Sequence, residues 1–139
     1  MIRDRPLLRQ VSRQAKAHLL ATSGDGALPP ALRDMLESEA FDIFYGAPVL
    51  MLLSCPADEA FGIVDCALAA QNLMLSARAL GLGTCWIGFA SAWLAGAEGR
   101  RSVGLPESQM AVAPIIVGYP RLKNLPQVPR REPEIRWIG

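Results

Sequence analysis

The spacing of apolar residues predicts two helices in the first third of the chain. Over residues 6–21, leucine, valine and alanine recur close to every 3.6 positions, the period of an α-helix with one buried face. Pro6 suits a first helical turn, and Gly24 lies just beyond the last one. A second helix is expected over residues 31–40, opened by Pro30. The first helix has a basic outer face, which we interpret as a solvated surface rather than a membrane or nucleic-acid contact.

Two later apolar runs predict strands in the core. Residues 49–55 are almost uniformly apolar and stand between Pro48 and Pro56, a pattern typical of a strand that is buried on both faces. Residues 112–119 predict a second core strand. We expect an irregularity in it at Pro114, because proline has no backbone N–H to donate to a neighbouring strand.

Residues 58–80 predict the longest helix. Apolar and small side chains surround almost the whole cylinder, and Gly81 is placed to end it. Several polar and charged residues interrupt the segment and would be costly in lipid, so a membrane span is not expected. A helix that is apolar all round belongs inside a larger core. In a chain of 139 residues, we expect a second copy to supply much of that core.

Glycines divide the region that follows. Gly81, Gly83 and Gly88 bracket a short β-prone run, which predicts a turn, a strand and a flexible point at its end. Ser91 is expected to cap a short helix over residues 92–101.

The last segment, residues 120–139, predicts an extended arm. Its prolines stand at positions 120, 126, 129 and 133, a density that forbids a packed helix. The arm ends in Ile135, Trp137 and Ile138, which we expect to be buried against a partner.

Composition narrows the class of protein. A chain of 139 residues is the size of one domain, and 51% hydrophobic against 19% charged residues excludes a disordered tail and favours an obligate oligomer. A net charge of +1 does not indicate the excess of positive charge that is typical of nucleic-acid-binding proteins. The basic N-terminus is not followed by an apolar run of signal-peptide length, so a cytoplasmic protein is expected.

The cysteines do not predict a metal or disulfide framework. Cys55, Cys66 and Cys85 show no CxxC spacing, and His18 is the only histidine. All three cysteines lie in apolar runs, where we expect reduced, buried thiols that behave as small hydrophobes.

The side chains do not form a recognisable catalytic group, and no catalytic residue is predicted. His18 is the only histidine and lies in the predicted N-terminal helix, so a Ser-His-Asp or Cys-His catalytic arrangement is not supported. The carboxylates show no paired spacing of the kind that glycosidases use for acid–base catalysis. Chemistry would therefore have to come from a cofactor. Backbone over residues 83–88 could approach a flat heterocycle, and Arg130 with Arg131 could bind phosphate. Alternatively, the glycines only make turns and the arginines form an exposed basic patch.

Several motifs together resemble the FMN-dependent nitroreductase family. In chain order they are residues 65–75 (DCALAAQNLML), 79–88 (ALGLGTCWIG), 105–107 (LPE), 112–120 (VAPIIVGYP) and 129–133 (PRREP), followed by Ile135 and Trp137. The resemblance covers residues 41–139 in matching order. The GTCWIG variant is most similar to members that can carry an N-terminal ferredoxin domain, although this chain has no iron–sulfur cysteine set.

The resemblance implies an α+β fold with helices around a mostly antiparallel sheet, built as an intertwined homodimer. The long helix would lie at the dimer interface, and the arm, residues 120–139, would cross onto the partner. FMN would bind at that interface, accept hydride from NAD(P)H and pass electrons to a small nitroaromatic or quinone-type acceptor. The residues implied to bind the cofactor are Gly83, Cys85, Trp86, Ile87, Gly88, Arg130 and Arg131. Those at 86–88 would lie beside the isoalloxazine, and the two arginines would reach the phosphate.

The N-terminal part departs from the family pattern. Family members begin with an Arg-Arg-Ser-type segment that binds phosphate, and this sequence has no counterpart of it. We therefore interpret residues 1–139 as a single domain that lacks the family's first part. An alternative to the flavoenzyme is a cofactor-poor relative that acts as a dimeric binding or structural module. A third hypothesis is that the natural chain is longer.

Overall fold

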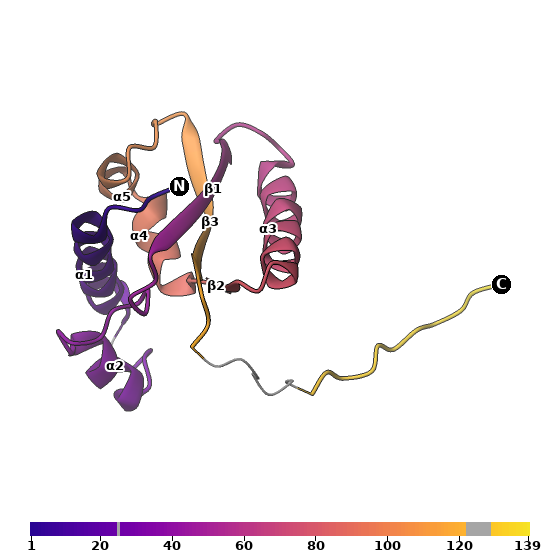
Figure 1. The fold of residues 1–139 in the computed structure, drawn as a ribbon, viewed down its shortest axis with the longest axis horizontal. Helices are drawn as coiled ribbons and strands as arrows, with labels where there is room; N and C mark the ends of the chain where they lie inside the picture. The colour runs from indigo at the N-terminus through magenta and orange to yellow at the C-terminus, as the bar shows by residue number, and fades with distance from the viewer. Residues whose placement is uncertain (25, 122–128) are drawn as a thin grey trace.

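The computed structural model describes residues 1–24, 26–121 and 129–139 (Figure 1). Its elements, in chain order, are α1 (Arg5–Thr22), α2 (Pro30–Glu37), β1 (Val49–Pro56), α3 (Gly62–Ala79), β2 (Gly83–Trp86), the 3-10 turn η1 (Gly88–Ala90), α4 (Ser91–Ala95), α5 (Ala97–Ser102) and β3 (Gln109–Gly118). The two long helices and both core strands thus lie close to their predicted ranges.

The sheet described here has three antiparallel strands in the order β1-β3-β2. Residues Val49 of β1 and Thr84 of β2 both pair with Val117 of β3. The register of β1 and β3 shifts between Leu53 and Ser54, opposite Val112, two residues before Pro114. The irregularity expected at the proline is therefore present nearby, and the mostly antiparallel sheet is confirmed.

Helices cover both faces of the sheet (Figure 1). Leu50 of β1 belongs to a core cluster with Leu8 and Val11 of α1 and with Leu94 of α4. Its neighbour Met51 points the other way and packs in a second cluster with Ala70 of α3. Because successive strand residues point to opposite faces, an unbroken apolar run is what a strand between two helical layers requires. This explains the predicted burial on both faces.

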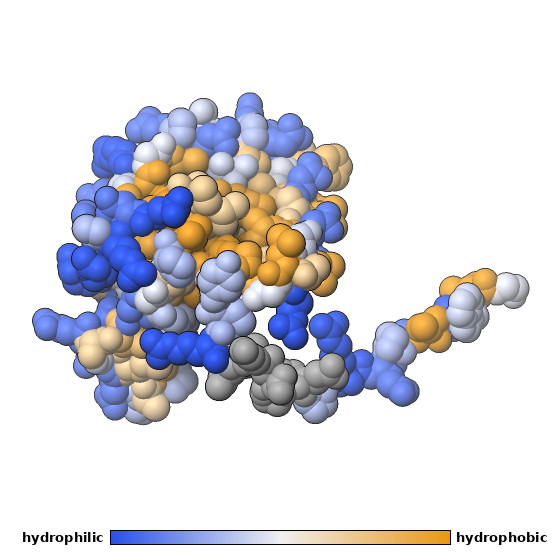
Figure 2. Space-filling model, viewed as in Figure 1, coloured by the Kyte–Doolittle hydropathy of each residue, from blue (hydrophilic) through white to orange (hydrophobic). Residues whose placement is uncertain are grey.

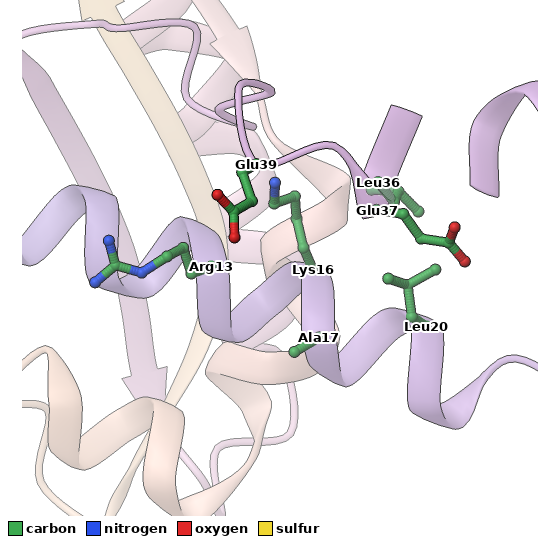
Figure 3. Close-up of a pocket in the computed structure, with 7 residues that line it drawn as sticks. All are labelled: Arg13, Lys16, Ala17, Leu20, Leu36, Glu37 and Glu39. Atoms are coloured by element: carbon green, nitrogen blue, oxygen red, sulfur yellow. The ribbon is translucent and has the colours of Figure 1, made fainter. Parts of the chain in front are cut away.

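The side chain of Lys16 fixes α1 to the segment that follows α2. It is buried, and its Nζ donates hydrogen bonds to the carbonyl oxygens of Ser38 and Phe41, each at 2.7 Å. Figure 3 shows Lys16 rising from α1 toward this segment, with Glu39 beside it, at a small cavity of about 290 Å³. The basic face of α1 is thus partly structural rather than wholly solvated.

Three predicted helices have different boundaries in the structure. The second helix ends at Glu37 rather than at residue 40. The long helix begins at Gly62 rather than at residue 58, because hydrogen bonds from Glu59 N–H to Pro56 O and from Gly62 N–H to Glu59 O form turns before it. The single helix expected over residues 92–101 is two short helices separated at Gly96.

The expected cap at Ser91 is also wrong. Ser91 is the first residue of α4, preceded by the 3-10 turn η1, and α4 has no side-chain cap. The break after α4 brings Gly99 of α5 directly against the Trp93 carbonyl, where an added Cβ would overlap it. A continuous helix cannot make this approach.

One side of α3 is exposed within a single chain. Cys66, Ala70 and Ala77 are buried toward the sheet. Large apolar side chains on and beside the helix are exposed: Phe61, Ile63, Val64, Leu68, Leu75 and Leu80. We call these six residues the α3 apolar face. Figure 2 shows hydrophobic surface along the side of the molecule where α3 lies. No helix in the described part of the chain is long and apolar enough to cross a membrane.

The three cysteines do not share one environment. Cys55 and Cys66 are buried as expected, but Cys85 is exposed. The expectation fails for Cys85 because its side chain lines a cavity at the end of the sheet and belongs to neither core cluster.

Candidate functional site

The end of α3 determines where β2 starts. Gly81 has a φ of +75°, a left-handed conformation that glycine adopts without a Cβ clash. The N–H of Leu82 then donates to Ala77 O at 2.9 Å, which closes the last turn of the helix. The chain leaves this turn as β2, at the edge of the sheet.

Residues Trp86 to Gly88 present accessible backbone at this edge. The Ile87 N–H donates to Pro114 O at 2.8 Å, and its side chain is buried in the first core cluster. Since backbone groups alternate in direction along a strand, the N–H and C=O of Trp86 are directed away from β3. The carbonyl receives a weak contact from the Cys85 thiol at 3.6 Å. At Gly88, an added Cβ would meet no atom within 4 Å, so the space above it is open.

A cavity of about 670 Å³ lies where β2 begins and β3 ends. Its walls come from three segments: Tyr45 to Pro48 before β1, Gly83 to Cys85 in β2, and Ile116 with Gly118 to Arg121 at the end of β3. We call this the sheet-end cavity. Strand pairing brings the segments together, because Gly83 is opposite Gly118 and Val49 is opposite Val117.

One wall of the sheet-end cavity is a strained turn. Tyr45 has a φ of +53°, which is unfavourable for a residue with a bulky side chain, and Gly46 follows at +67°. The Asp42 carboxylate holds the turn by accepting the N–H of Phe44 at 3.0 Å and of Gly46 at 2.9 Å. The Tyr45 side chain is 63% exposed, so it lies on the surface of the turn and not in the core. Strain that surrounding hydrogen bonds maintain is common at binding sites.

The lining residues favour binding over side-chain catalysis. Arg121 is the charged residue among the described residues of the sheet-end cavity, and Tyr45 and Tyr119 supply aromatic surface. Within that lining there is no carboxylate or histidine to act as a general base. No group of three histidine, cysteine or carboxylate side chains in the described ranges could hold a metal ion. Such a cavity can take a flat, anionic molecule.

The predicted site residues separate into two groups. The first group lies in one continuous stretch that leads from the sheet-end cavity to the open backbone edge. It consists of Gly83, Cys85, Trp86, Ile87 and Gly88. Residues 122–128 of the predicted arm lie outside the described residues. Arg130 and Arg131 are exposed in residues 129–139, which Figure 1 shows extending away from the sheet of the same chain. Their predicted role toward a phosphate stays a prediction.

Sequence reasoning missed part of the sheet-end cavity. Residues 46–48 and 119–121 line this cavity but are not among the predicted site residues. Their sequence signal is indirect. Both segments flank core strands, and only the antiparallel register brings those two strand ends together.

Comparison with known proteins identifies what the chain is similar to. The family model described as "Nitroreductase family" matches residues 5–119. The crystal structure of a nitroreductase with bound FMN from Bacteroides fragilis superimposes with a TM-score of 0.76 at 25% identity. That match covers 94% of this chain and 69% of the other. An FMN-dependent nitroreductase from Clostridium difficile gives a TM-score of 0.75 at 19% identity, over 99% of this chain and 76% of the other.

A curated relative from Methanothermobacter thermautotrophicus is named "Putative NADH dehydrogenase/NAD(P)H nitroreductase". It is 33% identical over an alignment of 97 positions, which covers 63% of this chain and 51% of the relative. A second relative with the same name, from Archaeoglobus fulgidus, is 22% identical over 121 residues, 59% of its length. The chain therefore matches between half and three fifths of these curated relatives.

Proposed function

We propose that this chain, which belongs to the nitroreductase family, is an FMN-dependent oxidoreductase. It moves hydride from NAD(P)H to a small nitroaromatic or quinone-type acceptor. The observation that carries the proposal is the open backbone edge at residues 86–88, which follows the β2 residues that line the sheet-end cavity. The nitroreductase of Bacteroides fragilis, which has this fold, has FMN bound.

The backbone edge fits the ring system of a flavin. A flavin ring is flat and has both donors and acceptors along its pyrimidine side, which outward N–H and C=O groups such as those of Trp86 can match. Gly88 leaves room for close approach because no atom would meet a Cβ there. The buried Ile87, held to Pro114, keeps this stretch rigid. The residues that would hold the ring are therefore Trp86, Ile87 and Gly88.

The phosphate end of FMN requires a cation, and we assign it to Arg130 and Arg131. Adjacent guanidinium groups can each donate two parallel hydrogen bonds to phosphate oxygens. Both are exposed on an arm that extends away from its own sheet, so their availability fits binding to the site of a second copy (Figure 1).

A homodimer is the second part of the proposal. The six residues of the α3 apolar face are between 54% and 76% exposed in one chain. Exposed apolar surface of this extent marks an interaction site, and each leucine-sized side chain contributes about 1.5–3 kcal/mol when it is buried. Three apolar side chains at the end of the arm are exposed as well, and an apolar surface of a second copy could bury them. They are Ile135, Trp137 and Ile138.

Bound FMN supplies the acceptance and donation of hydride, while the chain's own residues bind and orient. Tyr45 and Tyr119 offer flat apolar walls to an aromatic acceptor, and Arg121 attracts an anionic group on it. Since the described lining of the sheet-end cavity holds no carboxylate or histidine, we expect substrate choice to depend on shape and charge.

An FMN titration tests the proposal. Purified protein should gain a flavin absorbance band with FMN and retain it through gel filtration. Gly88→Val should weaken FMN binding by about tenfold or more, because the added side chain occupies the space above the ring edge. Gly24→Val is the matched control, since Gly24 also has open space around it but lies in the loop after α1.

Riboflavin has the flavin ring but no phosphate, so comparing it with FMN tests the two parts of the site separately. The double variant Arg130→Ala/Arg131→Ala should lose about 100-fold in FMN affinity and leave riboflavin affinity unchanged. Arg136→Ala, on the same arm, is the control for general charge loss. Protein that stays colourless with excess FMN would overturn the flavoenzyme and leave a dimeric binding module as the function.

A further inference from the structure

Two buried thiols meet at the first turns of α3, outside the proposed flavin site. Cys55 is near the end of β1, and Cys66 is on the buried side of α3. Only 6% and 7% of their surfaces are exposed. Neither thiol is part of the backbone edge or of the sheet-end cavity.

Gly62 allows the two cysteines to approach each other. A Cβ added at Gly62 would lie 2.6 Å from the Cys55 Sγ, so this sulfur rests directly on the first residue of α3. Cys66 follows Gly62 by four residues, which is about one helical turn, and both are buried on the same side of the helix. The geometry therefore brings the Cys55 sulfur beside the Cys66 side chain.

A cavity of about 340 Å³ gives small molecules access to the pair. Cys55, Cys66 and Gly62 line it, together with the carboxylate residues Glu59 and Asp65. Cys85 is on β2 and is exposed, and it does not line this cavity.

We propose that Cys55 and Cys66 form a dithiol site that a small hydroperoxide oxidises to an intramolecular disulfide. The disulfide would join the end of β1 to the second turn of α3. The proposal is independent of FMN and of the proposed reaction.

The reaction balances with one hydroperoxide per disulfide. One thiol loses its proton, and its sulfur attacks the peroxide oxygen. The O–O bond breaks, and the sulfur becomes a sulfenic acid while the other oxygen leaves as water or an alcohol. The second thiol then attacks the sulfenic sulfur, forms the S–S bond and releases water. Two thiols are oxidised by two electrons, which the peroxide accepts.

The surroundings predict how the reaction depends on pH. Burial raises the pKa of Cys66, and the neighbouring Cys55 thiol and the Asp65 carboxylate raise it further. Glu59 also faces the pair across the cavity. Since the thiolate is the nucleophile, the pair should react slowly at neutral pH and faster as the pH rises toward 9 and above.

Peptide mapping of the wild-type protein tests the proposal. The folded protein is treated with hydrogen peroxide, denatured in the presence of an alkylating agent and digested with Asp-N protease and trypsin. Asp-N cuts before Asp58 and Asp65 and separates Cys55 from Cys66, and trypsin cuts after Arg78 and separates Cys66 from Cys85. We expect one linked pair, Cys55 with Cys66, with Cys85 recovered separately. Protein oxidised after denaturation should give a mixture of pairings, because the fold no longer selects one.

Variants in which one cysteine is replaced test the roles of the cysteines separately. Cys85→Ser should leave the Cys55–Cys66 link unchanged. Cys66→Ser should abolish the internal link and leave a sulfenic acid on Cys55 that dimedone traps. Recovery of Cys55 and Cys66 as alkylated free thiols after peroxide, whether or not Cys85 has been oxidised, would overturn the proposal.

Discussion

Lys16 contacts Phe41 in two ways: its Nζ donates a hydrogen bond to the Phe41 carbonyl at 2.7 Å, and the same ammonium lies 5.9 Å from the centre of the Phe41 ring. It also donates to Ser38 O. A buried ammonium is stable here because backbone oxygens replace water. The contact joins α1 to the chain that leads into β1.

Replacing Lys16 with methionine should destabilise the fold. Lys16→Met keeps the apolar stem but leaves the carbonyls of Ser38 and Phe41 without this donor. Hydrogen bonds to charged groups each contribute about 1.5–3 kcal/mol, so losing both should lower the free energy of unfolding by about 3 kcal/mol or more. Urea denaturation measures it. Arg13→Met, an exposed change nearby on α1 (Figure 3), should cost less than about 0.5 kcal/mol.

Gly99 should not tolerate even one methyl group. In Gly99→Ala the Cβ would overlap the Trp93 carbonyl and lie 2.9 Å from the Leu94 Cα. Backbone cannot move as a flexible side chain can, so we expect a loss of about 3 kcal/mol or more in the free energy of unfolding. Gly24→Ala, with open space around it, serves as the control. Equal stability of the two variants would mean that α4 and α5 do not meet as described.

Asp42 should be needed for the strained turn at Tyr45. Asp42→Ala removes the acceptor of both the Phe44 and the Gly46 N–H groups, and we expect a loss of about 1–3 kcal/mol. Asp42→Asn retains one side-chain oxygen and should lose less than half as much. Thermal unfolding of the three proteins gives the comparison, and an alanine variant as stable as the parent would contradict it.

Much of this architecture could be predicted from local patterns. The apolar run over 49–55 indicated a strand covered on both faces, and the structure confirms it because α1 and α3 lie on opposite sides. Gly81 was correctly expected to end the long helix. Its backbone is in the left-handed conformation, which glycine adopts easily because it has no Cβ. These features depend on a few neighbouring residues.

The errors depend on contacts between distant segments. Cys85 sits in an apolar run, yet it is exposed because it lines the sheet-end cavity, which composition cannot reveal. The break at Gly96 depends on how Gly99 packs against Trp93. The sheet-end cavity likewise depends on the register that brings residues 45–48 beside 118–121.

A charge on the α3 apolar face should separate the proposed dimer. Leu68→Glu introduces a carboxylate at a side chain that is 61% exposed in one chain, so a monomer tolerates it while a buried interface does not. Sedimentation velocity should show the mass fall from two chains to one. Met35→Glu, on the partly exposed side of α2, should leave the mass unchanged. A wild-type protein that sediments as one chain would exclude the interface.

Cys66 should make stability fall in alkaline solution. Burial raises its pKa in the folded state above the ordinary thiol value of 9.0, whereas unfolding returns it toward that value. The folded state therefore holds the proton more tightly. Its contribution to stability is fully present below pH 9, and it is lost as the pH rises through the raised pKa. Cys66→Ala should flatten this part of the pH profile, measured by urea denaturation between pH 7 and pH 11.

Alkylation gives an independent measurement of the same shift. Iodoacetamide should modify the exposed Cys85 first, while Cys66 reacts only at higher pH because its thiolate is scarce and its sulfur is buried. Cys85→Ser removes the fast reaction and leaves the slow one to be followed alone by mass spectrometry. If Cys66 in the folded Cys85→Ser protein reacts as fast at pH 8 as in the unfolded chain, then neither burial nor the raised pKa protects it.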